Sequence, residues 1–418
     1  MINQELPMQD EIPSIASSRA ARVSMLVWNT FQNDARVLNE AKTLARAGYQ
    51  VTVHALALPG IAPRVETPEA GITVRRCGGG QGRKQIKSAG GRSASWFSLL
   101  LQASSRTFAL LQMGRAALRA RPQVIHAHDV NVLPTAWLAS KLAGAPLVYD
   151  AHEISTDREG YHAFRGLVAG LEKRIMPRAA GTITTTDARA KFFARAYGIP
   201  RPLVLQNRPR RVQPPRGNRI RDELGLSEPW PIVLYQGGLQ PGRGLLRLVE
   251  AAADVPNAYF VFIGGGRQRR ELGERAESLG LSHRVRFIPT VVLRELPSYT
   301  ASADIGVQPI ENTCLNHFTT DSNKLFEYVM AGLPVVASRL PEISRVVAPH
   351  DLGLLVPPGD TPALAAAIRR LVDEPSLRDE YRSRAALAAQ SLNWEAQEQA
   401  LVDLYARVLP APSAHPGS

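Results

Sequence analysis

The sequence of 418 residues lacks several features that define large classes of proteins. It has no apolar run of about 18 residues, so it predicts no membrane-spanning helix. Its only two cysteines, Cys77 and Cys314, lie far apart, which argues against a disulfide framework or a cysteine metal site and favours the cytosol. Residues 1–20 show no signal-peptide pattern, and we interpret them as a flexible leader, like the tail at residues 411–418.

Acidic residues are missing from two long segments. Residues 70–128 and 188–221 contain no Asp or Glu, and the whole chain has 50 Lys and Arg against 37 Asp and Glu, a net charge of +13. The basic residues of these segments would attract the phosphates of nucleotides, anionic lipids or nucleic acids. A solvated, arginine-rich surface would have the same composition, so both interpretations stay open.

Short β-branched runs alternate with helical patterns along the chain. The order begins with RVSMLVW at 22–28 and a helical period over 33–47, and it restarts with PIVLYQGG after a Pro- and Arg-rich segment. This βαβα order predicts parallel sheets with helices on both faces. We therefore predict an α/β fold of two Rossmann-like doubly wound domains that face a cleft. Its parts are an N-terminal domain (21–207), a linker (208–221), a C-terminal domain (222–392) and an amphipathic crossover helix (393–410).

The segment YQGGLQPGRGL, residues 235–245, has the composition of an anion site. Gly237 and Gly238 follow a predicted strand and let the backbone approach a ligand closely. A helix is predicted to open near Gly244, with unpaired N–H groups at its start, and Arg243 just before it could bind a phosphate. An ordinary turn between a strand and a helix would look similar.

Two charges of opposite sign, Lys324 and Glu327, stand near the start of a predicted helix. Asp321 or Ser322 could cap that helix, and its first turn together with Lys324 would bind a phosphate. Glu327 could accept two hydrogen bonds from vicinal hydroxyls such as those of a ribose. The alternative is an ion pair on a surface helix, worth only ~0.2–0.5 kcal/mol.

Two further motifs end strands of the first domain. HAHD at 126–129 places His128 where it could face the cleft and contact a sugar hydroxyl. YDAHE at 149–153 contributes His152 and Glu153, which could bind a hydroxylated acceptor or simply organise a loop. We expect no metal here, because no helix supplies a pair of ligands.

The ordered motifs resemble those of the retaining glycosyltransferases of the GT-B fold, family 4. The matching segments are NDARVLNEAKTLARAGYQVTVHA, VIHAHDVNVLPTAWLASKLAGAPLVYDAHE, GGLQPGRGLLRLVEAA, FVFIGGG, VRFIP, ADIGVQPI, NKLFEYVMAGLPVVAS and WEAQEQALVDLYARVL, which together span about residues 22–410. Each motif alone is loose, but the ordered set is specific. The resemblance implies transfer of a hexose or N-acetylhexosamine from a nucleotide sugar to a glycan or lipid-linked acceptor, in cell-surface polysaccharide synthesis.

The resemblance also implies roles for single residues. Glu327 matches the glutamate that binds the donor's ribose, Arg243 matches the basic residue on the diphosphate, and His128 matches the histidine near the transferred sugar. Lys324 completes the implied catalytic set. The implied donor site comprises Gly237, Gly238, Arg243, Gly265, Ile288, Asp321, Ser322, Asn323, Lys324 and Glu327. The candidate acceptor residues are Asn33, Asp34, Asp129, Asn131, His152 and Glu153.

Two positions depart from the family pattern. Gly238 stands where the family has an arginine, and Thr319 stands where it has a first glutamate, eight residues before Glu327. That glutamate normally contacts sugar hydroxyls, so Asp321 or Thr320 would have to replace it. The sequence contains no D-x-D, and we expect neither a catalytic metal nor another cofactor.

The acid-free segment before residue 128 contains a basic, glycine-rich loop followed by SASWFSLLLQ. This order predicts peripheral contact of a cytoplasmic protein with the anionic inner face of a membrane, with Trp96 and Phe97 at the interface. A packed helix with a solvated loop would fit as well. Two other functions stay open: a nucleotide-sugar epimerase of the same fold, and a basic nucleic-acid-binding protein. No nucleic-acid recognition motif is present, so we expect no nucleic acid as a partner.

Overall fold

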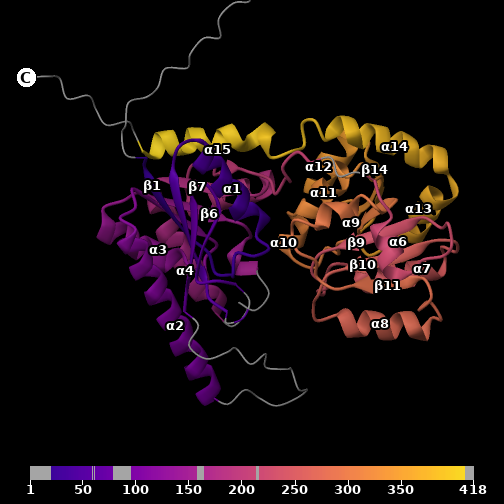
Figure 1. Ribbon diagram of the computed structural model, residues 1–418, viewed down its shortest axis with the longest axis horizontal. Coiled ribbons are helices and arrows are strands. Elements are labelled where there is room, and N and C mark those ends of the chain that lie inside the picture. Colours follow the sequence, from indigo (N-terminus) through magenta and orange to yellow (C-terminus); the bar gives the residue numbers. More distant parts are fainter. Residues whose placement is uncertain are drawn as a thin grey trace, which may run out of the picture.

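The computed structural model describes residues 20–58, 60, 62–78, 96–157, 164–212 and 216–409, without the side chains of residues 96–103. Two α/β domains lie side by side, and the last helix runs along the first of them (Figure 1). No described helix combines the length and the apolar character that a membrane span requires. The predicted tail and nearly all of the predicted leader lie outside the described residues, and so do most of the basic loop and the side chains of Trp96 and Phe97.

The N-terminal domain is built on an eight-stranded sheet with the order β3-β4-β2-β1-β5-β6-β7-β8. Neighbouring strands are parallel except for β3, which pairs antiparallel with β4 at one edge. The strands are β1 (Arg22–Leu26), β2 (Gln50–Leu56), β3 (Val65–Glu69), β4 (Ile72–Cys77), β5 (Val124–His128), β6 (Leu147–Ala151), β7 (Gly181–Thr184) and β8 (Leu203–Val204). The helices are α1 (Ala35–Arg46), α2 (Trp96–Arg119), α3 (Leu133–Ala143), α4 (Arg165–Ile175) and α5 (Asp187–Tyr197), with 3₁₀ turns η1 (Ser155–Asp157) and η3 (Met176–Arg178).

The C-terminal domain has a six-stranded parallel sheet with the order β11-β10-β9-β12-β13-β14. The strands are β9 (Ile232–Gln236), β10 (Tyr259–Ile263), β11 (Val285–Ile288), β12 (Ile305–Gln308), β13 (Val335–Ser338) and β14 (Gly353–Val356). The helices are α6 (Arg219–Leu224), α7 (Leu245–Ala253), α8 (Arg269–Ser278), α9 (Leu296–Thr300), α10 (Leu315–Phe318), α11 (Asn323–Met330), α12 (Pro341–His350), α13 (Thr361–Asp373) and α14 (Pro375–Ala388). Two doubly wound domains confirm the predicted fold class.

The central strands are buried along their whole length because helices cover both faces of each sheet. In β9, Val233 and Tyr235 face one apolar core, while Ile232 and Leu234 face the other. Such strands read as continuous apolar runs rather than as an alternation, which is why they were visible in the sequence. The polar Gln236, the last residue of β9, is nevertheless buried, with 1% of its surface exposed.

The last helix, α15 (Glu395–Val408), leaves the C-terminal domain and completes the core of the N-terminal domain (Figure 1). Trp394 is fully buried there, and its indole N–H donates to Thr43 Oγ1 at 2.8 Å. Leu401 packs in the same cluster. The Tyr405 hydroxyl lies 2.8 Å from His126 Nδ1 on β5. The end of the chain is therefore part of the first domain's interior.

A short seam joins the two domains around α10. The Asn316 side chain pairs with the backbone of Ile154: its amide donates to the carbonyl at 3.0 Å, and its oxygen accepts from the N–H at 2.8 Å. The Thr186 hydroxyl donates to the carbonyl of Thr319 at 3.0 Å. These contacts hold α10 against the loops after β6 and β7, so both domains border the same cleft.

Two local expectations need correction. Helix α6 begins at Arg219, inside the predicted linker 208–221, because Ile220 is fully buried and anchors it to the C-terminal domain. Strand β3 was not expected, since its sequence VETPE combines a proline with two glutamates. It is tolerated because it lies at a sheet edge, where a proline interrupts no central ladder.

Candidate active site

A cleft of about 790 Å³ lies between the domains. One wall is formed by the loop from β1 into α1, which includes Asn33 and Asp34, and by His152 after β6. The other wall is formed by the glycine turns after β9 and β10 and by the start of α11, with Glu327. Both walls stand at the carboxyl ends of parallel strands, where ligands bind in folds of this kind.

The glycine turns bring the ends of β9 and β10 close together. Gly264 has φ +140° and accommodates no side chain, because a Cβ there would lie 2.1 Å from the carbonyl oxygen of Gly237. Gly237 itself has φ +123° and donates its N–H to Ile263 O at 2.9 Å. Gly238 and Gly265 line the cleft next to them. The backbone is thus exposed to a ligand without any side chain in between.

Lys324 lies beneath this turn at the start of α11. Its Nζ donates to Ser322 Oγ at 3.0 Å and stands 5.3 Å from the centre of the Tyr235 ring. Burial, together with the nearby charge of Arg243, lowers the pKa of Lys324 to about 7. A phosphate at the glycine turn would restore the charged form.

The start of α11 differs from the predicted cap. Ser322 is the N-cap residue but makes no side-chain cap hydrogen bond, and its φ of +54° is rare for a serine. The Asp321 carboxylate accepts a hydrogen bond from Gln206 Nε2 at 2.7 Å instead of capping the helix, and burial raises its pKa to about 6. The first N–H groups of α11 therefore lack a side-chain cap. Asn323 is exposed and lines the cleft.

Glu327 is held by two amides. Gln236 Nε2 donates to Oε2 at 2.5 Å, and Asn323 Nδ2 donates to Oε1 at 3.3 Å. Burial raises the pKa of the carboxyl, while the amides and Lys324 oppose that rise. No cation pairs directly with Glu327 in the described part of the chain, so its carboxylate keeps lone pairs that can accept hydrogen bonds from a ligand.

Arg243 and Ile288 are placed differently. Arg243 lies in the loop between β9 and α7, half-buried and without a hydrogen bond or ion pair to any described residue. Its charge contributes, after burial, to lowering the pKa of His317. Ile288 is buried, and its carbonyl accepts the N–H of Gly264 at 3.0 Å. Neither residue lines the cleft itself.

On the opposite wall, Asp150 at the end of β6 is the centre of a buried polar cluster. Arg36 binds it with two hydrogen bonds of 2.6 and 2.8 Å, and His152 Nε2 lies 2.8 Å away. Burial lowers the pKa of His152, but the negative charges of Asp150 and Asp129 outweigh burial and raise the pKa to about 9. His152 is therefore a cation at neutral pH, and it is the member of the cluster that lines the cleft.

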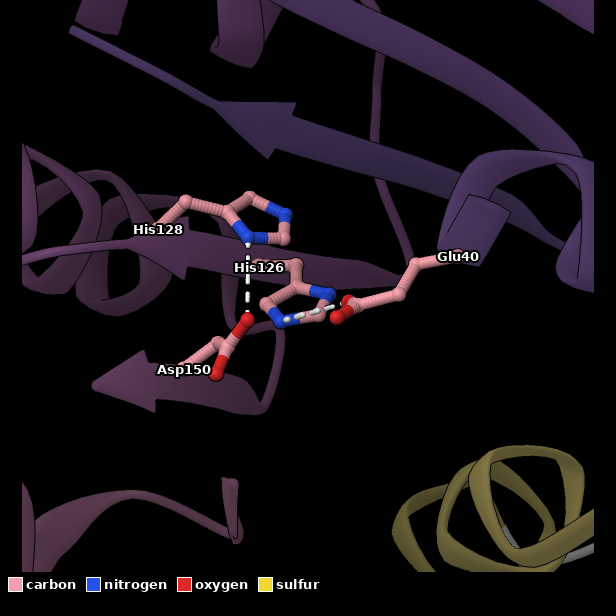
Figure 2. Close-up of side chains that lie close together, drawn as sticks. All are labelled: Glu40, His126, His128 and Asp150. Carbon is pink, nitrogen blue, oxygen red and sulfur yellow. Dashed lines mark ion pairs between the residues drawn. The ribbon is translucent and has the colours of Figure 1, made fainter. Parts of the chain in front are cut away.

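His128, which was predicted to face the cleft, lies beneath His152 instead. It is 2% exposed, and its Nδ1 lies 3.4 Å from Asp150 (Figure 2). Its ring stacks on that of His126 with 4.2 Å between centroids. Burial lowers the pKa of both histidines. Alternation along β5 does place them on one side of the strand, but α15 covers that side through Tyr405.

Figure 2 shows four groups of the metal-ligand type converging here, with Glu40 beside the two histidines and Asp150. One ligand atom from each lies within 4.8 Å of the others. Arg36 contacts both carboxylates, at 3.3 Å from Glu40 and 2.6 Å from Asp150. Its guanidinium therefore already provides the positive charge that a metal ion would bring to these carboxylates. Burial and then Asp150 raise the pKa of Glu40 well above its usual range. These contacts disfavour a metal here, and its absence stays a prediction.

The remaining candidate acceptor residues divide into two groups. Asp34 lines the cleft but also caps α1, because its Oδ1 accepts from Val37 N at 3.1 Å. Asn33 lines the cleft as well. Asp129, Asn131 and Glu153 do not line it; Asp129 stands 3.9 Å from His152, and Asn131 accepts a hydrogen bond from Arg106.

Sequence reasoning missed Gln236 and Arg189. Arg189 crosses the seam: Nη1 donates to His152 O at 2.6 Å, Nη2 to Asn316 O at 3.1 Å and Nε to Thr319 Oγ1 at 3.3 Å. Thr319 is thus buried against the N-terminal domain and lines no part of the cleft. The one visible signal for Gln236 was a polar residue that ends an apolar strand; Arg189 gave none.

Comparison with known proteins agrees with this geometry. Residues 34–208 match the family model described as glycosyl transferase 4-like domain, and residues 230–374 match that described as glycosyl transferases group 1. A D-inositol 3-phosphate glycosyltransferase of Streptosporangium roseum is 26% identical, with 95% of each chain covered.

Solved structures show the same fold. The sucrose-phosphate synthase of Thermosynechococcus elongatus superposes with a TM-score of 0.74 at 20% identity, covering 93% of this chain and 99% of its own. The Anabaena protein HepE, solved in complex with UDP and glucose, superposes with a TM-score of 0.68 at 19% identity, covering 92% of this chain and 99% of its own.

Proposed function

Since the chain belongs to the family 4 (group 1) glycosyltransferases of the GT-B fold, we propose that it moves a hexose or an N-acetylhexosamine from a nucleoside-diphosphate sugar to a hydroxyl of a glycan or lipid-linked saccharide. The observation that carries the donor assignment is the Glu327 carboxylate. It lines the cleft with unshared lone pairs, and Lys324 and the glycine turn lie beside it. A carboxylate suits the two hydroxyls of a ribose, and the turn with Lys324 suits a diphosphate.

The reaction follows from where charge develops. The acceptor oxygen forms a new bond to the anomeric carbon as the C–O bond to the diphosphate breaks. Negative charge develops on the nucleoside diphosphate, which takes the proton of the acceptor hydroxyl and leaves. Lys324 and the uncapped start of α11 stabilise that charge, and each such donor typically contributes a few kcal/mol. Arg243 does not line the cleft, but its charge acts on Lys324 and adds to the positive potential there. We assign these groups to binding the leaving group, and closure of the cleft to the exclusion of water.

On the acceptor side, we propose that His152 and Asn33 bind the acceptor, and that His128 acts through Asp150 and His152 rather than by direct contact. His152 lines the cleft as a cation, whereas His128 is buried below it. Retention of the anomeric configuration is also proposed. NMR of the product's anomeric proton tests it, and an inverted product would refute it.

The neighbour solved with UDP and glucose makes UDP-glucose the first donor to test. Calorimetric titration with UDP, GDP and ADP should show one nucleotide that binds clearly more tightly than the others. Arg243→Ala should lower kcat more than donor affinity, because its charge acts on the leaving group. If none of the three nucleotides binds, the proposal is refuted. Sugar nucleotide that is epimerised without any acceptor would point to an epimerase.

We further propose that the acceptor belongs to cell-surface polysaccharide synthesis and is reached from the inner face of a membrane. The support is the basic composition of residues 70–128, whose loop lies outside the described residues. Co-sedimentation with vesicles containing phosphatidylglycerol tests this. The Arg83/Lys84/Lys87→Glu variant should bind such vesicles less than the unmodified protein, and equal binding would refute the membrane contact.

A further inference from the structure

Gln236 connects the candidate ribose-binding carboxylate to the interior of the C-terminal domain. It ends β9 with 1% of its surface exposed. Its Nε2 donates to Glu327 Oε2 at 2.5 Å, and its Oε1 lies 2.8 Å from Thr300 Oγ1 on α9. A buried amide with a partner at each end has only two orientations, and each orientation fits a different set of partners.

The hydrogens in the hydrogen-bond chain from Thr300 through Gln236 to Glu327 can be counted. The Thr300 hydroxyl has one hydrogen and two acceptors within reach, Gln236 Oε1 at 2.8 Å and the Leu296 carbonyl at 2.9 Å. If Thr300 donates to Gln236, the amide donates to an ionised Glu327. If Thr300 donates to Leu296, the reversed amide donates to Thr300 Oγ1, and its oxygen then needs a hydrogen from a protonated Glu327. Each state of the carboxyl therefore has its own fully paired arrangement.

We propose that Gln236 is a positioning residue for the donor site: its amide holds Glu327 ionised and oriented for the donor's ribose, and it reverses when Glu327 is protonated. This inference rests on the proposed function, because it assumes that Glu327 binds a nucleotide. The ionised carboxylate is purely an acceptor and binds both ribose hydroxyls by charge-assisted hydrogen bonds, whereas the protonated carboxyl must donate from one oxygen and accepts more weakly.

The surroundings make Gln236 the main support of the ionised state. The groups that act on Glu327 in the described structure are Gln236 from β9 and Asn323 and Lys324 from its own helix. Burial raises the pKa of Glu327, and these three groups oppose that rise. Asn323 lies farther away, at 3.3 Å, and Lys324 donates to Ser322 rather than to Glu327. Without the Gln236 hydrogen bond, protonation of Glu327 would extend to higher pH.

The test is nucleotide affinity as a function of pH. Calorimetric titration with UDP, or with GDP or ADP if that nucleotide binds better, should show affinity that falls with pH below about pH 6, where Lys324 is already charged and Glu327 takes up its proton. Gln236→Met keeps the side-chain length and removes the hydrogen bond. We expect this variant to shift the fall in affinity upward by about one pH unit and to bind roughly 10-fold more weakly at pH 7. Turnover at saturating donor should change less than KM.

Gln308 offers a matched control. It is also a buried glutamine that ends a strand, β12, but it contacts the Asp321 carbonyl and not Glu327. Gln308→Met should leave the pH at which affinity falls unchanged. Thr300→Val removes only the far partner of Gln236 and should give a smaller shift in the same direction; it also serves if Gln236→Met does not fold.

A 2′-deoxynucleotide separates positioning from general damage. Gln236→Met should weaken its binding less than that of the ribonucleotide, because one of the two hydrogen bonds to Glu327 is already missing. An unchanged pH dependence in folded Gln236→Met or Thr300→Val would overturn the inference and leave the proposed function intact. If the unmodified protein binds none of the three nucleotides, the proposed function itself fails.

Discussion

Two carboxylates, the fully buried Asp150 and the half-buried Glu327, stand on opposite sides of the cleft in contrasting surroundings. Asp150 accepts hydrogen bonds from Nε and Nη2 of Arg36 and one from His152. Burial raises its pKa, but the two cations outweigh burial and hold it well below its usual range. Among the described residues, Glu327 receives hydrogen bonds only from amides, and burial leaves its pKa raised.

The contrast separates a carboxylate that organises the protein from one that is available to a ligand. A carboxylate whose oxygens are filled by a guanidinium and an imidazole has little capacity left for substrate, and its removal leaves buried cations unpaired. A carboxylate supported by neutral amides keeps acceptor capacity at some cost in stability. The following variants test this division, from the largest expected effect to the smallest.

Asp150→Asn should cause the largest loss of stability. The free energy of unfolding should fall by about 3–5 kcal/mol, because Arg36 and His152 would lose their closest carboxylate and keep only Glu40 at 3.3 Å and Asp129 at 3.9 Å. Urea unfolding measures this. Asp129→Asn is the control, since that carboxylate is 3.9 Å from His152 and should contribute less than about 1 kcal/mol. Equal losses of stability in the two variants would refute the claim that Asp150 is the carboxylate that organises this cluster.

Glu327→Gln should leave the fold intact and weaken nucleotide binding about 10- to 100-fold, since hydrogen bonds to a charged acceptor are typically worth ~1.5–3 kcal/mol each. Calorimetry measures the loss. Glu311→Gln, which breaks an ion pair with Arg247 in the same domain, should leave nucleotide affinity unchanged. A Glu327→Gln variant that binds as the unmodified protein does would refute its assignment to the ribose.

Lys324 provides a pH test on the same wall. Because burial and Arg243 lower its pKa to about 7, it is mostly neutral at pH 8, and a bound diphosphate should charge it. Nucleotide binding at pH 8 should therefore take up nearly one proton, and uptake should vanish below about pH 6. Titrations in buffers of different ionisation enthalpy measure the uptake. Lys324→Met should abolish it, and uptake that persists would exclude Lys324 as the acceptor of that proton.

The same pKa shift affects the stability of the free protein, with a fixed sign. Between about pH 7 and the ordinary lysine pKa of 10.5, the unfolded chain holds more protons than the folded one. Stability should therefore rise with pH across this window. Lys324→Met should flatten that rise. If the slope is unchanged in the variant, other groups cause it.

Thr319→Ala should have the smallest effect. It removes the hydroxyl that accepts from Arg189 and donates to Leu315, which should cost about 1 kcal/mol of stability. Nucleotide affinity should change less than about 2-fold, because Thr319 lines no part of the cleft among the described residues. Thermal unfolding and calorimetry measure the two effects. A large loss of affinity would return Thr319 to the sugar site.

The sequence predicted the fold because its signal is local. Apolar runs such as those of β9 and β10 are buried on both faces and read as strands without any knowledge of their neighbours. The family resemblance then supplied the order of the motifs and the expected position of Glu327. The cap of α11 was misjudged because the positive φ of Ser322 leaves no mark in the composition of TTDSN.

The pairings inside the site were beyond a local reading. Gln236 and Glu327 are 91 residues apart, and Arg36 and Asp150 are 114 apart. The sequence could not show that His152, and not His128, lines the cleft. His128 is buried in a cluster that is completed by α15, at the far end of the chain. The sequence showed that Thr319 stands where the family has a glutamate. It did not show that Thr319 accepts a hydrogen bond from Arg189, which lies across the domain seam.

The position of Trp394 and Tyr405 in the N-terminal core has a consequence for synthesis on the ribosome. Strand β8 ends at Val204, so about 190 further residues must be translated before Trp394 is made. At 5–20 residues per second this takes roughly 10–40 s. Throughout that time the nascent first domain has an open apolar groove along α1, where chaperones or a neighbouring nascent chain can bind before its own last helix arrives.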